Sequence, residues 1–216
     1  MDLFEAIRAG NGAEVQAILA REPGAVNRRN DRGHSPVLIA QYHHKHDIVK
    51  DLLSHDPELD LFDACCVGRT DRVAAALDAD PALLNAYNSD GFFPLGLAAF
   101  FGHPDTVKLL LARGADVAQV ARNPMKIQPL HAGAASKNAI VVQLLVAAGA
   151  PVNATQEGGW TPLHAAAKEG NLDMARALLA KGADPKQTND KGVSAIGLAA
   201  ESGNMDMLKL LKAERT

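Results

Sequence analysis

The feature that most constrains this chain is a pattern that returns at an interval of about 33 residues. Residues 160–167 read WTPLHAAA, and a glycine, an Ala-Leu-Leu run and Gly-Ala-Asp follow them. Pro129, Pro162 and Ala195 are evenly spaced, and the slightly longer interval from Pro94 to Pro129 leaves room for an insertion. A repeat of this length is one supersecondary unit that cannot bury its own apolar face. We therefore expect a stack of units, in which each unit covers its neighbours.

The residues of one repeat predict two helices and the turns that separate them. The hydroxyl of Thr161 can cap a helix, and Pro162 in the first turn gives up only an amide that would have no partner there. Gly170 and Gly182 stand where helices are expected to end. Leucines such as Leu178 recur on one stripe of each helix and need a neighbouring unit to cover them.

The N-terminal half carries a second regularity, because it aligns with itself at one constant shift. The aligned pairs are Leu3 and Leu61, Phe4 and Phe62, Gly10 and Gly68, Val15 and Val73, Leu19 and Leu77, Pro23 and Pro81, Asn27 and Asn85, Gly33 and Gly91, and Pro36 and Pro94. This indicates a duplicated block of two units, of which the first has helices but no recognisable hairpin. We expect one domain, residues 1–216, with seven units near residues 1–29, 30–60, 61–87, 88–120, 121–154, 155–187 and 188–216.

These motifs resemble the ankyrin repeat, a unit of about 33 residues with a β-turn and two antiparallel helices. The resemblance is specific over residues 88–212 and looser over residues 31–60, where His44 replaces the usual glycine between the helices. The alanine-rich units and the hairpin of residues 121–125 resemble those of bacterial ankyrin proteins. The implied fold is an all-α ankyrin-repeat solenoid of about seven stacked helix pairs with β-turn or hairpin loops. Two units of its N-terminal half lack a full hairpin.

Charge and cysteine content restrict the partners and the compartment. The formal charge is −3, from 22 Lys and Arg against 25 Asp and Glu, so no positive field attracts nucleic acid. No apolar run reaches the roughly 20 residues of a membrane helix, and the start Met-Asp-Leu-Phe-Glu is unlike a secretory signal. We expect a cytoplasmic monomer that binds neither nucleic acid nor membranes.

Candidate catalytic groups are few. Cys65 and Cys66 have no base that the sequence places beside them, and we expect them to pack as small apolar residues. Gly158 and Gly159 belong to a hairpin and are not followed by the Lys-Ser or Lys-Thr of a phosphate-binding loop. The sequence therefore predicts a protein that is not an enzyme and that needs no cofactor.

Eight histidines raise the question of metal binding. His131 and His164 stand in the Thr-Pro-Leu-His position, where the resemblance implies a structural hydrogen bond to a neighbouring turn. Five others crowd residues 34–55, but only His43 and His46 are expected to share a helix face. We expect no metal ligands among them. Binding of a metal by this unit, or of a small ligand by an aromatic groove, remains the alternative function.

The resemblance also implies where a partner binds. In ankyrin proteins the hairpin tips and the exposed side of each first helix form a concave groove. Of nine aromatic residues in the chain, five fall on such positions: Tyr42, Phe92, Phe100, Phe101 and Trp160. Exposed aromatic side chains gathered on one surface are typical of binding sites. The alternative is that these rings pack against adjacent turns or against the inserted hairpin with Met125 and Ile127.

We therefore predict a non-enzymatic scaffold or inhibitor that holds a partner protein in this groove. The predicted contact residues run from an aromatic centre to a charged flank: Tyr42, His43, Phe92, Phe100, Phe101, Met125, Ile127, Trp160, Lys168, Glu169 and Glu201. The partner should present an apolar anchor beside groups of mixed charge. The inserted hairpin around Met125 could also cover the groove as a lid.

Overall fold

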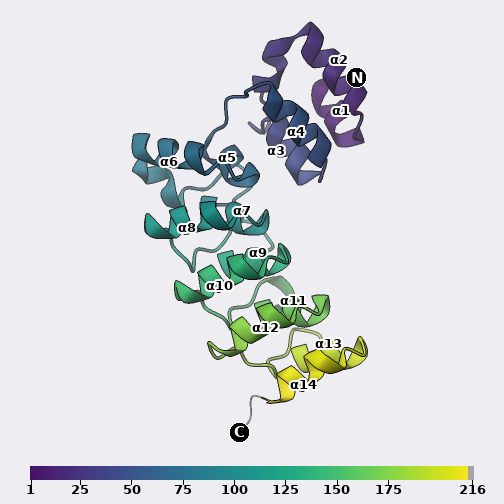
Figure 1. Cartoon of the computed structure of the whole chain (residues 1–216), viewed down its shortest axis with the longest axis vertical. Helices are drawn as coiled ribbons and strands as arrows, with labels where there is room; N and C mark the ends of the chain where they lie inside the picture. Colours follow the sequence, from purple (N-terminus) through teal and green to yellow (C-terminus); the bar gives the residue numbers. More distant parts are fainter. Residues whose placement is uncertain (214–216) are drawn as a thin grey trace.

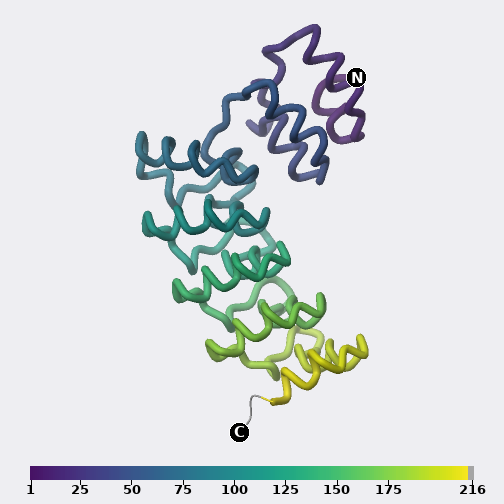
Figure 2. The backbone as a smooth tube through the Cα atoms, viewed as in Figure 1, coloured from purple at the N-terminus to yellow at the C-terminus, as the bar shows by residue number. Residues whose placement is uncertain are grey.

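The computed structural model describes residues 1–213, and over this range its regular structure consists of helices joined by turns and loops, with one isolated β-bridge between Thr188 and Ser194. The first helices of the seven pairs are α1 (Leu3–Ala9), α3 (Pro36–Tyr42), α5 (Leu61–Val67), α7 (Pro94–Phe100), α9 (Pro129–Ala135), α11 (Pro162–Glu169) and α13 (Ala195–Glu201). The second helices are α2 (Gly12–Arg21), α4 (His46–Ser54), α6 (Thr70–Ala79), α8 (Pro104–Ala112), α10 (Ala139–Ala147), α12 (Leu172–Leu179) and α14 (Met205–Ala213). Three short 3-10 helices are η1 (Pro23–Asn27), η2 (Pro81–Asn85) and η3 (Glu157–Gly159). Figures 1 and 2 show the pairs following one another along the molecule, which confirms the predicted solenoid of seven helix pairs.

Short polar side chains fix where the first helices begin. Thr161 accepts a hydrogen bond from the backbone N–H of His164, and Ser35 and Ser194 cap α3 and α13 in the same way. Such caps contribute about 1 kcal/mol each. After α3, His44 has a φ of 54° and occupies the left-handed position that a glycine takes after other first helices. The turn between α3 and α4 therefore has the same backbone conformation although His44 stands in place of glycine.

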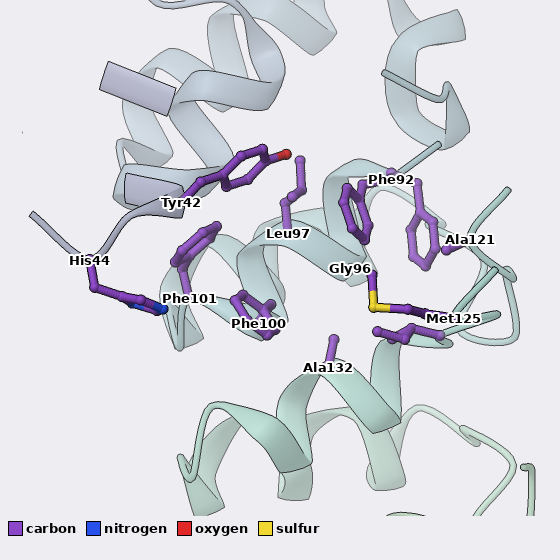
Figure 3. A pocket seen from close by; sticks show the side chains of 12 residues that line it. Tyr42, His44, Phe92, Gly96, Leu97, Phe100, Phe101, Ala121, Met125 and Ala132 are labelled. Atoms are coloured by element: carbon purple, nitrogen blue, oxygen red, sulfur yellow. The ribbon is translucent and has the colours of Figure 1, made fainter. Parts of the chain in front are cut away.

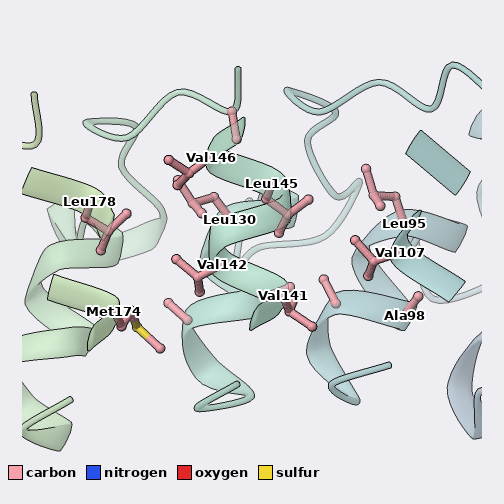
Figure 4. Close-up of a cluster of buried hydrophobic side chains, with 14 of the residues drawn as sticks. Leu95, Ala98, Val107, Leu130, Val141, Val142, Leu145, Val146, Met174 and Leu178 are labelled. Carbon is pink, nitrogen blue, oxygen red and sulfur yellow. The ribbon is translucent and has the colours of Figure 1, made fainter. Parts of the chain in front are cut away.

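Aliphatic side chains stack between successive pairs and form the core. Leu95, Leu130 and Leu163 lie at equivalent places on α7, α9 and α11, and each is at most 1% exposed. The second helices add Leu145 and Leu178, which are fully buried (Figure 4). Because each leucine is covered from both sides, the pairs stabilise one another and not only themselves.

The two N-terminal blocks of the duplication have the same local structure. Asp2 and Asp60 cap α1 and α5, each with a capping box. The side chains of Asn30 and Asn88 accept the backbone hydrogen bonds that close the hairpins before α3 and α7. Before α5 the chain forms no such hairpin, since residues 55–60 lead directly into this helix from α4.

The stack changes direction between α4 and α5. The side chains buried among α1 to α4 form one cluster, and those from α5 onward form another, which Leu38 of α3 joins. Consecutive second helices pack against each other elsewhere, but α4 has no comparable packing against α6. Figure 1 accordingly shows the first two pairs turned away from the axis of the other five. We call residues 1–54 the N-terminal body and residues 61–213 the main stack.

Polar contacts join these two bodies. Arg29, in the hairpin before α3, donates to the carboxylate of Asp63 at 3.0 Å and lies 2.9 Å from Asp60. The hydroxyl of Ser35 donates to Asp63 at 2.7 Å, and the side-chain amide of Gln41 donates to the backbone oxygen of Cys66 at 2.8 Å. Burial of Asp63, together with the neighbouring Asp60, raises the pKa of the Asp63 carboxyl to about 6.

Candidate partner-binding site

The third helix pair lacks a hairpin, and aromatic residues of its two neighbours meet across it. Helix α5 packs against both α3 and α7, and its small residue Cys66 is fully buried. Tyr42 ends α3, and Phe101 follows the last residue of α7. Their ring centroids lie 6.3 Å apart with the planes inclined by only 15°. Two residues that belong to different repeat units thus stack with nearly parallel rings.

These rings form part of an apolar recess of about 250 Å³, which we call the aromatic recess. Its lining residues are Tyr42, His44, Phe92, Phe93, Gly96, Leu97, Phe100, Phe101, Ala121, Met125, Ile127 and Ala132 (Figure 3). Gly96 adds no side chain to the wall, and a Cβ at this position would lie 2.9 Å from the ring of Phe93. The recess therefore depends on a glycine inside α7.

The aromatic side chains hold one another in place. The rings of Tyr42 and Phe92 meet edge to face at 6.4 Å, and those of Phe100 and Phe101 are perpendicular at 5.1 Å. Pairs of this geometry contribute about 0.5–1.5 kcal/mol beyond the area they bury. Phe100 nevertheless keeps 40% of its surface exposed. The recess is thus a preformed surface with an open ring at its edge.

The inserted hairpin between α8 and α9 supplies the opposite wall. Its base closes through the N–H of Ala121, which donates to the backbone oxygen of Ile127 at 2.9 Å. The N–H of Arg122 donates at 2.8 Å to the backbone oxygen of Gly91, in the preceding hairpin. Met125 is 42% exposed, and its side chain runs along the recess in Figure 3. Main-chain hydrogen bonds therefore position this wall.

Comparison with known families agrees with the geometry. Residues 3–121 and 130–215 match the family described as Ankyrin repeats (3 copies). The chain belongs to the ankyrin-repeat family. Ankyrin repeats generally serve as protein–protein interaction modules. The match is interrupted at residues 122–129, which include the part of the inserted hairpin that carries Met125 and Ile127. A search among curated proteins finds no match.

Two histidines have the structural role that the ankyrin resemblance implied. The Nε2 atom of His131 donates to the backbone oxygen of Ala154, and that of His164 to the backbone oxygen of Val193, both at 3.0 Å. Burial lowers the pKa of both imidazoles, so the neutral form is favoured. Each histidine thus ties its ankyrin helix to the following hairpin or turn, and the prediction is confirmed.

The histidines of the second ankyrin unit do not share a helix face. His43 is the residue that caps the end of α3, and His46 is the first residue of α4. The expectation that they lie on one face was wrong, because the chain turns at His44 between the two helices. Among residues 1–213, no three His, Cys, Asp or Glu side chains are grouped in a way that could hold a metal ion.

The structure separates the residues predicted to contact a partner. Tyr42, Phe92, Phe100, Phe101, Met125 and Ile127 line the aromatic recess, and the others lie outside it. Trp160 is half-buried, with its ring 5.5 Å from that of His164 and the Lys168 ammonium 5.9 Å from its centre. Glu169 pairs with Lys137 at 2.5 Å. His43 and Glu201 are exposed outside the aromatic recess.

Three of the larger residues that line the aromatic recess were missed by sequence reasoning: His44, Phe93 and Leu97. Phe93 and Leu97 are almost fully buried, and they contribute only the floor of the recess. The shift that aligns the two N-terminal blocks pairs His44 with Gly102 and so gave no signal for His44, but it does pair Tyr42 with Phe100. That pairing placed one aromatic residue at the same point of two different units.

A group of Ser, His and Asp side chains near the recess does not form a catalytic triad. Nε2 of His34 lies 2.9 Å from a carboxylate oxygen of Asp90 and 3.3 Å from the hydroxyl of Ser89. A triad requires the acid and the nucleophile to meet different ring nitrogens. Here both meet the same one, so the contacts join the hairpin before α3 to the hairpin before α7.

No helix within residues 1–213 has the length and apolar character needed to cross a membrane.

Proposed function

We propose that this ankyrin-repeat protein is a non-enzymatic interaction module, a scaffold or an inhibitor, that binds a partner protein at the aromatic recess. The observation that carries the proposal is that six residues expected from the sequence to contact a partner line one apolar recess. They are Tyr42, Phe92, Phe100, Phe101, Met125 and Ile127. The general role of ankyrin repeats supports the class of function.

The size of the recess favours a side chain of a partner over a free small ligand. Pockets for small molecules usually measure about 300–1,000 Å³, whereas the aromatic recess measures about 250 Å³. Burying one large apolar side chain contributes about 1.5–3 kcal/mol. One leucine, methionine or phenylalanine of the partner would therefore act as an anchor residue, with further contacts outside the recess.

The state of the cysteines supports the non-enzymatic part of the proposal. Cys65 and Cys66 are free and fully buried. Burial raises the pKa of the Cys65 thiol well above its usual range, which keeps it protonated and unreactive. Free buried thiols also suit the monomer in a reducing cytoplasm that we propose as its working state.

Capture by matched variants tests the site. The full chain, its Phe100→Ala variant and its Ile140→Ala variant are immobilised and exposed to a lysate of the source organism. Ile140 is the control, because it is 56% exposed on α10 and lies outside the aromatic recess. We expect proteins that bind the wild type and Ile140→Ala but not Phe100→Ala. For a purified binder the loss should be about 2 kcal/mol, the size of an interface hot spot.

Thermal unfolding followed by circular dichroism accompanies the capture. Because Phe100 is partly exposed, its variant should melt close to the wild type. Equal capture by Phe100→Ala and wild type would contradict the proposed site. A fall in stability as large as the fall in binding would instead assign Phe100 to the core.

A further inference from the structure

The start of α7 differs from the start of the next two first helices. In α11, the hydroxyl of the capping residue Thr161 lies 2.7 Å from Nδ1 of His164, the third residue of the helix. Both side chains are buried. Helix α9 likewise has a histidine, His131, as its third residue. In α7 the cap is Phe93, which makes no side-chain capping bond, and the third residue is Gly96. An apolar ring and a glycine therefore replace a polar cap and an imidazole.

The ring of Phe93 occupies the space beside Gly96. A Cβ on Gly96 would lie 2.9 Å from two carbon atoms of this ring, well inside the usual packing distance of about 3.5–4.0 Å between carbon atoms. Phe93 is 1% exposed, and its ring meets that of Tyr87 edge to face at 6.1 Å. The ring can form the floor of the aromatic recess because the third residue of α7 is glycine.

The histidine of α11 also fills the space toward the next hairpin. Nε2 of His164 donates at 3.0 Å to the backbone oxygen of Val193, the oxygen that closes the base of the hairpin before α13. The equivalent oxygen after α7 belongs to Ile127, at the base of the inserted hairpin. Because Gly96 has no imidazole, no ring extends from α7 toward Ile127. Both residues line the aromatic recess (Figure 3).

The lining of the aromatic recess offers few polar side-chain atoms. Among its lining residues, all within residues 1–213, only Tyr42 and His44 carry a side-chain nitrogen or oxygen. The Tyr42 hydroxyl accepts a hydrogen bond of 3.5 Å from the side-chain amide of Asn88, and His44 is exposed. A polar group that enters the recess leaves water and finds no side-chain partner at the floor, which is unfavourable.

We propose that Phe93 and Gly96 together determine which side chain the aromatic recess accepts. They leave an open, apolar floor where other units have a polar cap and an imidazole. Such a floor selects a phenylalanine, leucine or methionine of the partner over a side chain that ends in a hydroxyl or an amide. This inference rests on the proposed function and identifies the residues that set its specificity.

Two side-chain analogues test the selectivity on the purified wild-type chain, without a partner or a variant. Toluene is the side chain of phenylalanine, and 4-methylphenol is that of tyrosine. An NMR titration of the ¹⁵N-labelled protein measures both affinities. We expect toluene to bind at least about ten-fold more tightly, with shifts centred on residues 93–101 and 121–127. Equal affinities, or no toluene binding at these residues, would overturn the inference.

Gly96→Ala and Gly197→Ala form a matched pair. Gly197 is the third residue of α13, and a Cβ there would lie at an ordinary contact distance, 3.6 Å from Val193. Alanine raises the helix propensity at both positions, so the collision with Phe93 distinguishes them. Gly96→Ala displaces the ring of the floor and should weaken toluene binding about ten-fold or more. Gly197→Ala should bind toluene like the wild type. Wild-type affinity in Gly96→Ala would contradict the proposed role of Gly96.

The double variant Phe93→Thr and Gly96→His gives α7 the pair that α11 has. Its threonine can cap α7, and its imidazole can reach the backbone oxygen of Ile127, so the helix keeps its contacts while the recess is filled. We expect an unfolding temperature close to that of the wild type and no measurable toluene binding. Toluene binding at wild-type affinity by this variant would overturn the inference.

Partner capture separates this inference from the proposed function. Suppose that Gly96→Ala loses toluene binding but captures the same proteins as the wild type. The partner then does not use the aromatic recess, and the proposed function fails. If Phe100→Ala loses capture while Gly96→Ala keeps both capture and toluene binding, the proposed function stands, and only the role of Phe93 and Gly96 is overturned.

Discussion

Neighbouring hairpins are joined in one way within the main stack and in another way between the N-terminal body and the main stack. In the main stack the joints are main-chain hydrogen bonds: Arg122 N–H to Gly91, Glu157 N–H to Met125 and Asp190 N–H to Gly158, at 2.8–3.2 Å. Between the hairpins before α3 and α7 the joint is made by the side chains of His34, Arg32 and Asp90. The unit that lies between those two hairpins, residues 61–87, has no hairpin. The aromatic recess lies at this irregular joint, so the departure from the repeat is where the molecule gains a distinctive surface.

The largest expected effect concerns the two separate clusters of buried side chains. Leu178→Ala in the main stack and Leu19→Ala in the N-terminal body should each cost about 2–5 kcal/mol, the usual range for a buried leucine. Because the clusters are distinct, Leu19→Ala should expose α1 to α4 before it affects α7 to α14. Hydrogen exchange followed by mass spectrometry measures each region. A single common loss of protection in both variants would show that the two bodies unfold as one.

Two equivalent glycines of the duplicated blocks provide the next test. Gly33 and Gly91 both have a positive φ, 79° and 76°. A Cβ at Gly91 would lie 2.4 Å from the backbone oxygen of Arg122, whereas nothing lies within 4 Å of a Cβ at Gly33.

Gly33→Ala should therefore cost only the left-handed strain, about 1–2 kcal/mol. Gly91→Ala adds a collision with fixed main chain and should cost at least about 1 kcal/mol more. Urea unfolding of both variants measures the difference. Equal costs would mean that the hairpins of the main stack can move apart freely.

A smaller effect is expected at Trp160, which lies in the regular part of the stack. Since Trp160 packs on His164 and lies outside the aromatic recess, Trp160→Ala should weaken partner capture by less than about 1 kcal/mol. Phe100→Ala, measured in parallel, should weaken it by about twice that amount or more. A loss at Trp160 equal to the loss at Phe100 would extend the binding surface along the stack to α11.

A fall in pH should change the stability contributed by His131 and His164 and that contributed by Asp63 in opposite directions. In the main stack, burial lowers the pKa of His131 and His164 below the ordinary 6.5, so their stabilising contribution is lost as the pH falls through 6.5. At the joint, the pKa of Asp63 is raised from 3.8 to about 6. Its folded form therefore binds a proton more readily than the unfolded form, and its contribution grows as the pH falls through 6.

Hydrogen exchange at pH 7 and pH 5, corrected for intrinsic rates, measures this difference. Protection of residues 60–66 should rise relative to that of residues 129–135 and 161–167. In Asp63→Asn the relative rise should disappear, because the titrating group is gone. A parallel fall in all three segments, unchanged by Asp63→Asn, would contradict the opposite signs.

Most of the fold followed from the sequence because the repeat requires it. The positions of Thr161, Pro162 and His164 fix a cap, a first turn and a hydrogen bond to the next unit, and each was found as expected. These interactions are local or join adjacent units, so the period of the repeat determines them. The same reasoning identified the aromatic positions that surround the recess.

The sequence did not predict that only some of the expected contact residues would line the aromatic recess. Family positions assign Trp160 and Phe100 to the same surface, but the surroundings of each ring depend on which side chains the neighbouring units present. Tyr42 stacks on Phe101 across the unit of α5, whose Cys66 is small and buried and which has no hairpin. The change of direction between α4 and α5 could not be predicted from the sequence either. It accompanies the absence of packing between α4 and α6.

The position of the aromatic recess bears on how such a site can arise. Tyr42 and Phe100 are the same position of two copies of one duplicated block. A single block would carry one such ring and no facing wall, so neither copy contains the site alone. Tyr42 comes from the first copy and α7 from the second, and the inserted hairpin outside both copies supplies the remaining wall. A substitution in one copy therefore changes one wall of the recess and leaves the wall from the other copy as it was.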